Sequence, residues 1–142
     1  MLTIDNRWLG AHDLRPCIAI AGTVRLAVPY DFLPLQSDSL RATFGPKDQR
    51  ERTQPINYVN GNSPPLLLAS GLDDSTVSPR NSRRLAKKMQ QNGGSAVTRY
   101  YEDIGHVCLV ASLAAPFRHL AQVLDDMDGF FKQHPKPRGC NG

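Results

Sequence analysis

Two short and almost wholly apolar segments constrain the fold of this chain more than any other feature. Residues 17–28 read Cys-Ile-Ala-Ile-Ala-Gly-Thr-Val-Arg-Leu-Ala-Val, and residues 66–69 read Leu-Leu-Leu-Ala. Apolar runs of this kind, in which polar residues do not alternate, are typical of strands that are covered on both faces in a parallel sheet. A third strand is predicted at residues 96–101, so we expect three strands of one sheet.

Helical patterns lie between and after these strands. Ser78-Pro79 and Gly93-Gly94 are start and stop signals of a helix, because proline is favoured in the first helical turn and glycine directly after the last. Apolar residues at helical spacing also follow position 106, with an interruption at Pro116. The order strand, excursion, strand, helix, strand, helix predicts an α/β fold, with a parallel sheet in a three-layer α/β/α arrangement.

The chain is expected to form one partial domain. Its 142 residues fit a single domain, which we place at residues 1–134, with a flexible tail at residues 135–142. Residues 30–64 are rich in Pro, Asn, Asp and Gly and are predicted to form an excursion on the active-site side, with a short helix at residues 39–44. Residues 1–9 look like the end of a helix, because no N-cap residue precedes them. Three parallel strands are few for such a sheet, so we expect one bare edge.

The basic charge of the chain does not indicate a nucleic-acid partner. The net charge is +4 and the pI is near 9.2, but most of the excess falls on the polar side of one predicted helix. No aromatic residues interleave with these charges, as they would in many nucleic-acid sites, so a solvated helix face explains them. No segment has the length and apolar character of a membrane span, and no leader pattern is present, so we expect a soluble, cytoplasmic protein. The basic residues are Arg80, Arg83, Arg84, Lys87 and Lys88.

The three cysteines suit a reducing compartment. Cys17, Cys108 and Cys140 form an odd set without close Cys-x-x-Cys spacing, so neither a disulfide framework nor a zinc site is indicated. Cys17 and Cys108 lack the sharp Gly-x-Cys-x-Gly turn of a nucleophile, and we expect both to pack in the interior.

Two polar motifs follow the second and third predicted strands. Gly71-Leu-Asp-Asp-Ser-Thr-Val77 comes after one strand, and Gly105-His106 comes after the next. The carboxyl ends of parallel strands meet at one rim, so Asp74 and His106 are expected to lie close together there. A carboxylate that orients a histidine is part of a hydrolytic triad. Each motif alone also suits an ordinary turn, in which Asp73-Asp74 would cap the backbone.

The two motifs together resemble the acid-to-histidine half of the α/β-hydrolases. Further stretches are similar to the esterase/lipase group that includes feruloyl-esterase-like and kynurenine-formamidase-like hydrolases, and the resemblance runs from residue 1 to residue 131. It implies that Asp74 is the orienting acid, with Asp73 as its neighbour, and that His106 is the general base. These stretches are Pro29-Tyr30-Asp31-Phe32-Leu33-Pro34-Leu35, Pro55-Ile56-Asn57-Tyr58, Pro64-Pro65-Leu66-Leu67-Leu68 and Pro79-Arg80-Asn81-Ser82.

The triad serine of the family has no counterpart here. No Gly-x-Ser-x-Gly elbow occurs in the chain, and Ser63, Ser70 and Ser95 lack its glycines. Residues 1–9 resemble the far end of the helix that follows the elbow, so the serine and the oxyanion-hole loop are expected upstream of Met1. Other departures are Ser70 for a histidine, Gln54 for a serine, and Ala27-Val28 for Ser-Gly.

The resemblance implies a carboxylic ester hydrolase that needs no metal and no organic cofactor. Removal of a triad serine costs on the order of 10⁶ in rate, so we expect little ester hydrolysis by this chain alone. Its substrate would be a small ester or amide, bound once an N-terminal half completes the site. The alternative is a non-catalytic fragment, or a module that binds a partner or a second copy of itself through the bare sheet edge. His12, His119 and His134 have no acid at a recognisable spacing.

Overall fold

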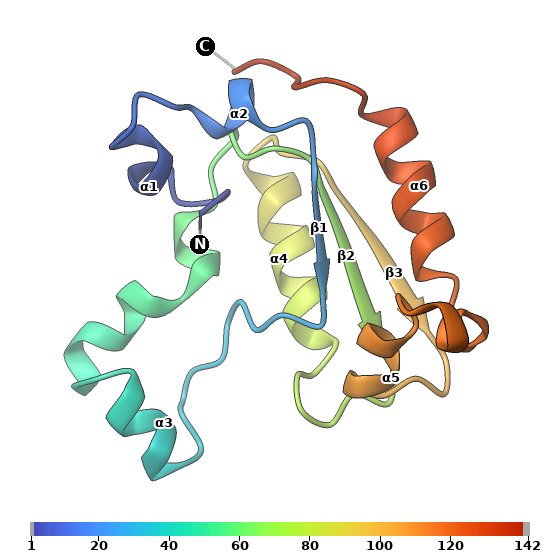
Figure 1. The fold of residues 1–142 in the computed structure, drawn as a ribbon. Coiled ribbons are helices and arrows are strands. Elements are labelled where there is room, and N and C mark those ends of the chain that lie inside the picture. Colours follow the sequence, from blue (N-terminus) through green and yellow to red (C-terminus); the bar gives the residue numbers. More distant parts are fainter. Residues whose placement is uncertain (1, 141–142) are drawn as a thin grey trace.

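The computed structural model describes residues 2–140 and contains one three-stranded parallel sheet. The strands β1 (Thr23–Leu26), β2 (Leu66–Gly71) and β3 (Ala96–Tyr101) lie in the order β1-β2-β3. Helices cover both faces of this sheet (Figure 1). The prediction of an α/β fold with a parallel sheet is therefore confirmed.

The central strand β2 is buried along its whole length. Leu66 pairs with Thr23 of β1 on one side and with Ala96 of β3 on the other, and the register continues from there. A strand with a neighbour on each side and helices on both faces has no surface in contact with water. This position explains why residues 66–69 are continuously apolar.

Two hydrophobic cores lie on opposite faces of the sheet. On one face, Leu66 and Leu68 pack with Leu85 and Met89 of α4 (Arg80–Gln91). The other core includes Leu109 of α5 (His106–Ala111) and Val123, the first residue of α6 (Val123–Gln133). The three predicted layers are present, and the helices after positions 79 and 106 form as expected.

The first predicted strand is much shorter than the apolar run suggests. Pro16 begins the helical turn α2 (Pro16–Ala19), because proline suits the first position of a helix. Only Thr23 to Leu26 pair with β2, and Ala27 then adopts a positive φ of 47°. The prediction of a strand at residues 17–28 was therefore wrong over most of its length.

The N-terminal helix α1 (Asn6–Gly10) has its own N-cap, so the prediction that it lacks one was also wrong. The Oδ1 atom of Asp5 accepts a hydrogen bond from the backbone nitrogen of Arg7 at 3.1 Å. The Arg7 guanidinium donates to both carboxylate oxygens, and these bonds lower the pKa of Asp5. Met1 lies outside the described residues.

Residues 30–64 contain the short helix α3 (Asp38–Thr43) and two 3-10 helices, η1 (Lys47–Thr53) and η2 (Pro55–Tyr58). The excursion is attached to the domain by side-chain amides. Asn81 of α4 accepts hydrogen bonds from the backbone nitrogens of Tyr30 and Asp31, both at 3.0 Å. The buried Gln54 accepts one from Phe32 nitrogen at 2.8 Å. The two bonds to Asn81 fix the start of the excursion against α4, and the bond to Gln54 joins two parts of the excursion itself.

A disulfide joins Cys17 and Cys140, whose Cα atoms are 5.1 Å apart. The prediction that no disulfide is present was therefore wrong. Cysteine spacing cannot reveal a pair that is separated by 123 positions and brought together by the fold. The expectation of a reducing compartment rests on the same spacing and loses that support, because disulfides persist mainly in oxidising compartments. The cytoplasmic location was expected from the absence of a leader pattern and stays a prediction.

The C-terminal stretch beyond α6 contains no helix or strand up to Cys140. It is attached to the domain at its end, since the backbone nitrogen of Gly139 donates to the carbonyl of Cys17 at 3.1 Å, next to the disulfide. Asn141 and Gly142, the end of the expected flexible tail, lie outside the described residues. No helix between residues 2 and 140 is long and apolar enough to cross a membrane.

The disulfide is expected to stabilise the folded chain by about 2–4 kcal/mol, because it restricts the unfolded chain through a long loop. Cys17→Ser should lower the free energy of unfolding by this amount, as measured by urea denaturation. Cys108→Ser is the matched control, since Cys108 is an exposed free thiol. Equal stability of both variants and the parent chain would contradict this role.

Candidate active site

Asp74 and His106 meet at the rim formed by the carboxyl ends of β2 and β3. Asp74 lies in the turn after β2, and His106 is the first residue of α5, which follows β3. The Oδ2 atom of Asp74 lies 2.8 Å from Nδ1 of His106. The Asp74 side chain is fully buried, and one third of the His106 side chain is exposed. The fold thus joins two side chains that are 32 positions apart in the sequence.

Backbone donors hold the Asp74 carboxylate in place. Its Oδ1 atom accepts hydrogen bonds from the backbone nitrogens of Thr76 at 2.9 Å and Val77 at 2.7 Å. The ordinary turn capping considered from the sequence is therefore present at one oxygen, while the other oxygen faces His106. A carboxylate with both oxygens engaged has one orientation, so it can fix the orientation of the imidazole.

The turns after β2 and β3 are packed directly against each other. The backbone nitrogen of Asp73 donates to the carbonyl of Ile104 at 3.1 Å, and that of Leu72 donates to the carbonyl of Tyr101 at 2.9 Å. Gly71 lies against Ile104 with no space for a side chain. This close approach sets the distance between the turn of Asp74 and the start of α5.

The contact with Asp74 determines what the histidine can do. A carboxylate accepts a hydrogen bond, so Nδ1 of His106 carries the proton, and Nε2 of the neutral ring is an acceptor. No hydrogen bond to Nε2 is formed by any residue from 2 to 140. The partly exposed ring can therefore accept a proton from a hydroxyl group that approaches from outside these residues.

The serines considered from the sequence do not form a nucleophile with His106. The hydroxyl of Ser70 is buried and bonded to that of Ser82 at 2.7 Å. Ser63 is buried in the turn before β2, and Ser95 immediately precedes β3, at the opposite end of the strand from His106. In the described part of the chain, the pair of Asp74 and His106 has no bonded third member.

The remaining sequence candidates lie outside the pair. Asp73 is exposed and reaches the site only through its backbone. Cys108 is exposed on α5, so the prediction that it packs in the interior was wrong. His12 and His119 are exposed. His134 donates from Nδ1 to the carbonyl of Phe130 at 2.8 Å, which gives it a structural role in α6.

Residues 2–140 contain no group of three or more His, Cys, Asp or Glu side chains that could hold a metal ion. The arrangement at the rim is one buried acid and one histidine. Its chemistry is therefore that of a carboxylate-oriented base.

Solved structures of esterases share this fold over part of their length. A truncated form of a carbohydrate esterase from gut microbiota matches with a TM-score of 0.62 and 23% identity, over 81% of this chain and 42% of the esterase chain. An esterase from Thermogutta terrifontis, solved with propionate and also with butyrate bound, matches in its propionate form with a TM-score of 0.60 and 19% identity, over 80% and 42%. The carboxylesterase Cest-2923 from Lactobacillus plantarum matches with a TM-score of 0.54 and 17% identity, over 64% of this chain and 33% of the carboxylesterase chain.

These matches define the class: the chain has part of the α/β-hydrolase fold. It spans about two fifths of the length of the first two esterases. The family is shown by its sequence model, which matches residues 18–138, and the chain belongs to the prolyl oligopeptidase family. No curated protein matches the chain. The sequence resemblance to α/β-hydrolases is thus confirmed at the level of the fold. The family that is shown is the prolyl oligopeptidase family, and the narrower likeness to the esterase/lipase group stays a prediction.

Proposed function

We propose that this chain supplies the acid and the base of a serine-type hydrolase that cleaves small carboxylic esters. The contact of 2.8 Å between Asp74 Oδ2 and His106 Nδ1 carries the proposal. Burial of the carboxylate and partial exposure of the imidazole give each group the environment that its role needs. Asp74 orients the ring and stabilises its protonated form, and His106 accepts a proton through Nε2.

The reaction follows from the ability of His106 Nε2 to accept a proton. A serine hydroxyl within hydrogen-bond reach of Nε2 would lose its proton to His106 while its oxygen attacks the ester carbonyl. The protonated His106 then donates to the departing alcohol, and an acyl-enzyme remains. A water molecule then gives a proton to His106 while its oxygen attacks the acyl-enzyme. The protonated His106 returns the proton to the serine oxygen, and the carboxylic acid is released. Asp74 keeps its charge throughout, because its two backbone donors and the imidazolium stabilise the carboxylate.

The nucleophile and the oxyanion donors would come from a segment that pairs with β1. This strand has a neighbour on one side only among the described residues. Apolar side chains are exposed on the elements that precede it: Trp8 of α1 is 55% exposed and Ile18 of α2 is 57% exposed. An unpaired strand edge and exposed apolar groups both suit the addition of further strands and helices.

Esters are the proposed substrate class, with amides second. The esterase structures support ester cleavage, and the propionate- and butyrate-bound forms support a short acyl group. The family name refers to oligopeptide cleavage, which uses the same acid and base on an amide. The narrower placement near feruloyl-esterase-like or kynurenine-formamidase-like hydrolases rests on the sequence stretches of residues 29–35 and 55–58.

The test is reconstitution of the site. The chain is produced together with a separate N-terminal segment that carries a Gly-x-Ser-x-Gly elbow, from the coding sequence directly upstream of Met1. We expect hydrolysis of p-nitrophenyl propionate and labelling of the serine by a fluorophosphonate only when both pieces are present. Equal hydrolysis by the chain alone, or an inactive complex of the two pieces, would contradict the proposal.

A partner-binding module is the second candidate, and the β1 edge, which no other strand of residues 2–140 covers, favours it. In this case the chain folds, binds the N-terminal segment or a second copy of itself, and stays without activity. Sedimentation velocity of the chain alone and of the mixture separates self-association from binding of the segment. Activity in the mixture would favour the hydrolase.

A further inference from the structure

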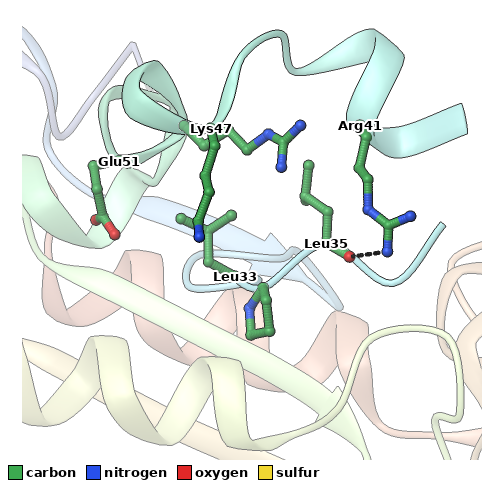
Figure 2. A pocket seen from close by; sticks show the side chains of 7 residues that line it. Leu33, Leu35, Arg41, Lys47 and Glu51 are labelled. Carbon is green, nitrogen blue, oxygen red and sulfur yellow. Dashed lines mark hydrogen bonds between the residues drawn. The ribbon is translucent and has the colours of Figure 1, made fainter. Parts of the chain in front are cut away.

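A cavity of about 530 Å³ lies in the excursion, away from the contact between Asp74 and His106. Its volume is within the range of small-molecule sites. One wall is apolar and the other carries basic side chains of α3 and η1. Figure 2 shows the side chains of Arg41 and Lys47 extending from the helical segments toward the loop that carries Leu33 and Leu35. The lining residues are Leu33, Pro34, Leu35, Arg41, Lys47, Arg50 and Glu51.

Two of the three basic residues have no counter-ion in the described part of the chain. Arg41 forms an ion pair with Asp38 and also donates to the carbonyl of Leu35 at 3.3 Å, so its charge is matched and its position is fixed. Lys47 and Arg50 form no ion pair with any residue from 2 to 140. The Nε atom of Arg50 donates to the carbonyl of Gly45 at 2.9 Å, which holds the guanidinium at the cavity.

Lys47 and Arg50 both lie on η1, and side chains three positions apart on a 3-10 helix leave it on the same side. Both line the cavity, so an anion bound there would be attracted by two positive charges. Glu51 lies four positions after Lys47 on η1, and its carboxylate accepts a hydrogen bond from the Asn57 side chain at 3.1 Å.

The wall opposite these cations is apolar and anchored. Leu35 is 5% exposed and Leu33 is half-buried. Phe32, directly before them, is fixed by its bond to Gln54 and stacks near Phe44, the C-cap of α3. The cavity is therefore held between α3, η1 and an attached loop. A ligand that fits has an anionic group at one end and an apolar body at the other.

We propose that this cavity binds a small amphipathic carboxylate, with its carboxylate between Lys47 and Arg50 and its apolar part against Leu33 and Leu35. Lys47 and Arg50 supply two unpaired positive charges, and Glu51 supplies one negative charge at the same cavity. This balance suits a ligand with one negative charge better than a ligand with several. The inference goes beyond the proposed hydrolase, because it concerns binding and needs neither a serine nor His106.

The test measures binding of 1-naphthoate to the full chain by isothermal titration calorimetry, with neutral 1-naphthamide as the matched ligand. We expect naphthoate to bind at least about 10-fold more tightly than the amide, since a charged hydrogen bond is lost with the amide. Its affinity should also fall as NaCl is raised, because salt screens exposed charges. Equal affinity of the two ligands, or no binding of naphthoate, would overturn the proposal.

Variants locate the binding. Lys47→Gln and Arg50→Gln should each weaken naphthoate binding by about 5- to 20-fold and leave amide binding unchanged. Lys136→Gln is the control, because Lys136 is exposed in the C-terminal stretch and outside the cavity. Circular dichroism shows whether each variant is folded, and Lys47 is exposed, so its replacement should not disturb the fold. Unchanged affinity in both folded cavity variants would place the anion elsewhere and contradict the site.

Discussion

Replacement of Gly71 with alanine should unfold the chain or nearly so. A Cβ atom at this position would lie 2.7 Å from the carbonyl carbon of Ile104 and closer still to its oxygen. Both obstructing atoms belong to the backbone of the neighbouring turn, so no side-chain rotation relieves the overlap. We expect a loss of about 5 kcal/mol or more in the free energy of unfolding, at the upper end of single substitutions. Urea denaturation followed by circular dichroism measures it.

Two glycines serve as matched controls for Gly71→Ala. At Gly105 an added Cβ meets only the carbonyl of Asp73, at an ordinary 3.7 Å, and at Gly129 of α6 it meets nothing within 4 Å. Gly105→Ala should be tolerated, and Gly129→Ala should stabilise the helix by up to about 1 kcal/mol. If Gly71→Ala were as stable as Gly105→Ala, the close approach of the two turns would not hold in solution.

Loss of the base should abolish the activity of the reconstituted enzyme. His106→Ala removes the acceptor for the serine proton, and we expect a fall in kcat on the order of 10⁶-fold. Asp74→Asn keeps the shape of the acid but reverses the hydrogen bond to Nδ1, which favours the wrong tautomer, so we expect a fall on the order of 10⁴-fold. Steady-state hydrolysis of p-nitrophenyl propionate by the mixture of the two pieces gives both numbers.

The matched control for His106→Ala is His119→Ala, because His119 is exposed on the 3-10 helix η3 (Ala115–Leu120). Its kcat should equal that of the unsubstituted mixture. Activity that survives both His106→Ala and Asp74→Asn would show that another pair performs the reaction, even if the two pieces assemble. Sedimentation velocity of each variant mixture shows whether the pieces still associate.

The strands and the pair of candidate catalytic residues could be predicted because they depend on local patterns. The apolar run at residues 66–69 requires a covered strand, and residues 96–101 form β3 with the predicted bounds. Parallel strands bring their carboxyl ends to one rim, so the proximity of Asp74 and His106 followed from topology alone. The backbone bonds that fix Asp74 depend on the geometry of one turn and could only be seen in the structure.

The features missed from the sequence depend on contacts between distant segments. Cys17 and Cys140 approach only because α2 and the C-terminal stretch lie at the same end of the domain (Figure 1). The late start of β1 depends on the helical turn that begins at Pro16, and its early end coincides with the left-handed backbone of Ala27. Counting apolar residues detects neither feature. Lys47 and Arg50 belong to no sequence motif. They line a cavity only because the fold places the loop of Leu33 and Leu35 opposite them.

The bond between Cys17 and Cys140 turns most of the chain into a covalent ring. The excursion and the candidate active site both lie inside this ring. A protease that cuts once within the ring, for example at the exposed polar turns of η1, opens the ring but releases no piece. The cut chain keeps its mass apart from one added water, and a reducing gel is needed to separate the two parts. A single break in the excursion is therefore compatible with an assembled sheet, so the integrity of the backbone and that of the domain have to be assayed separately.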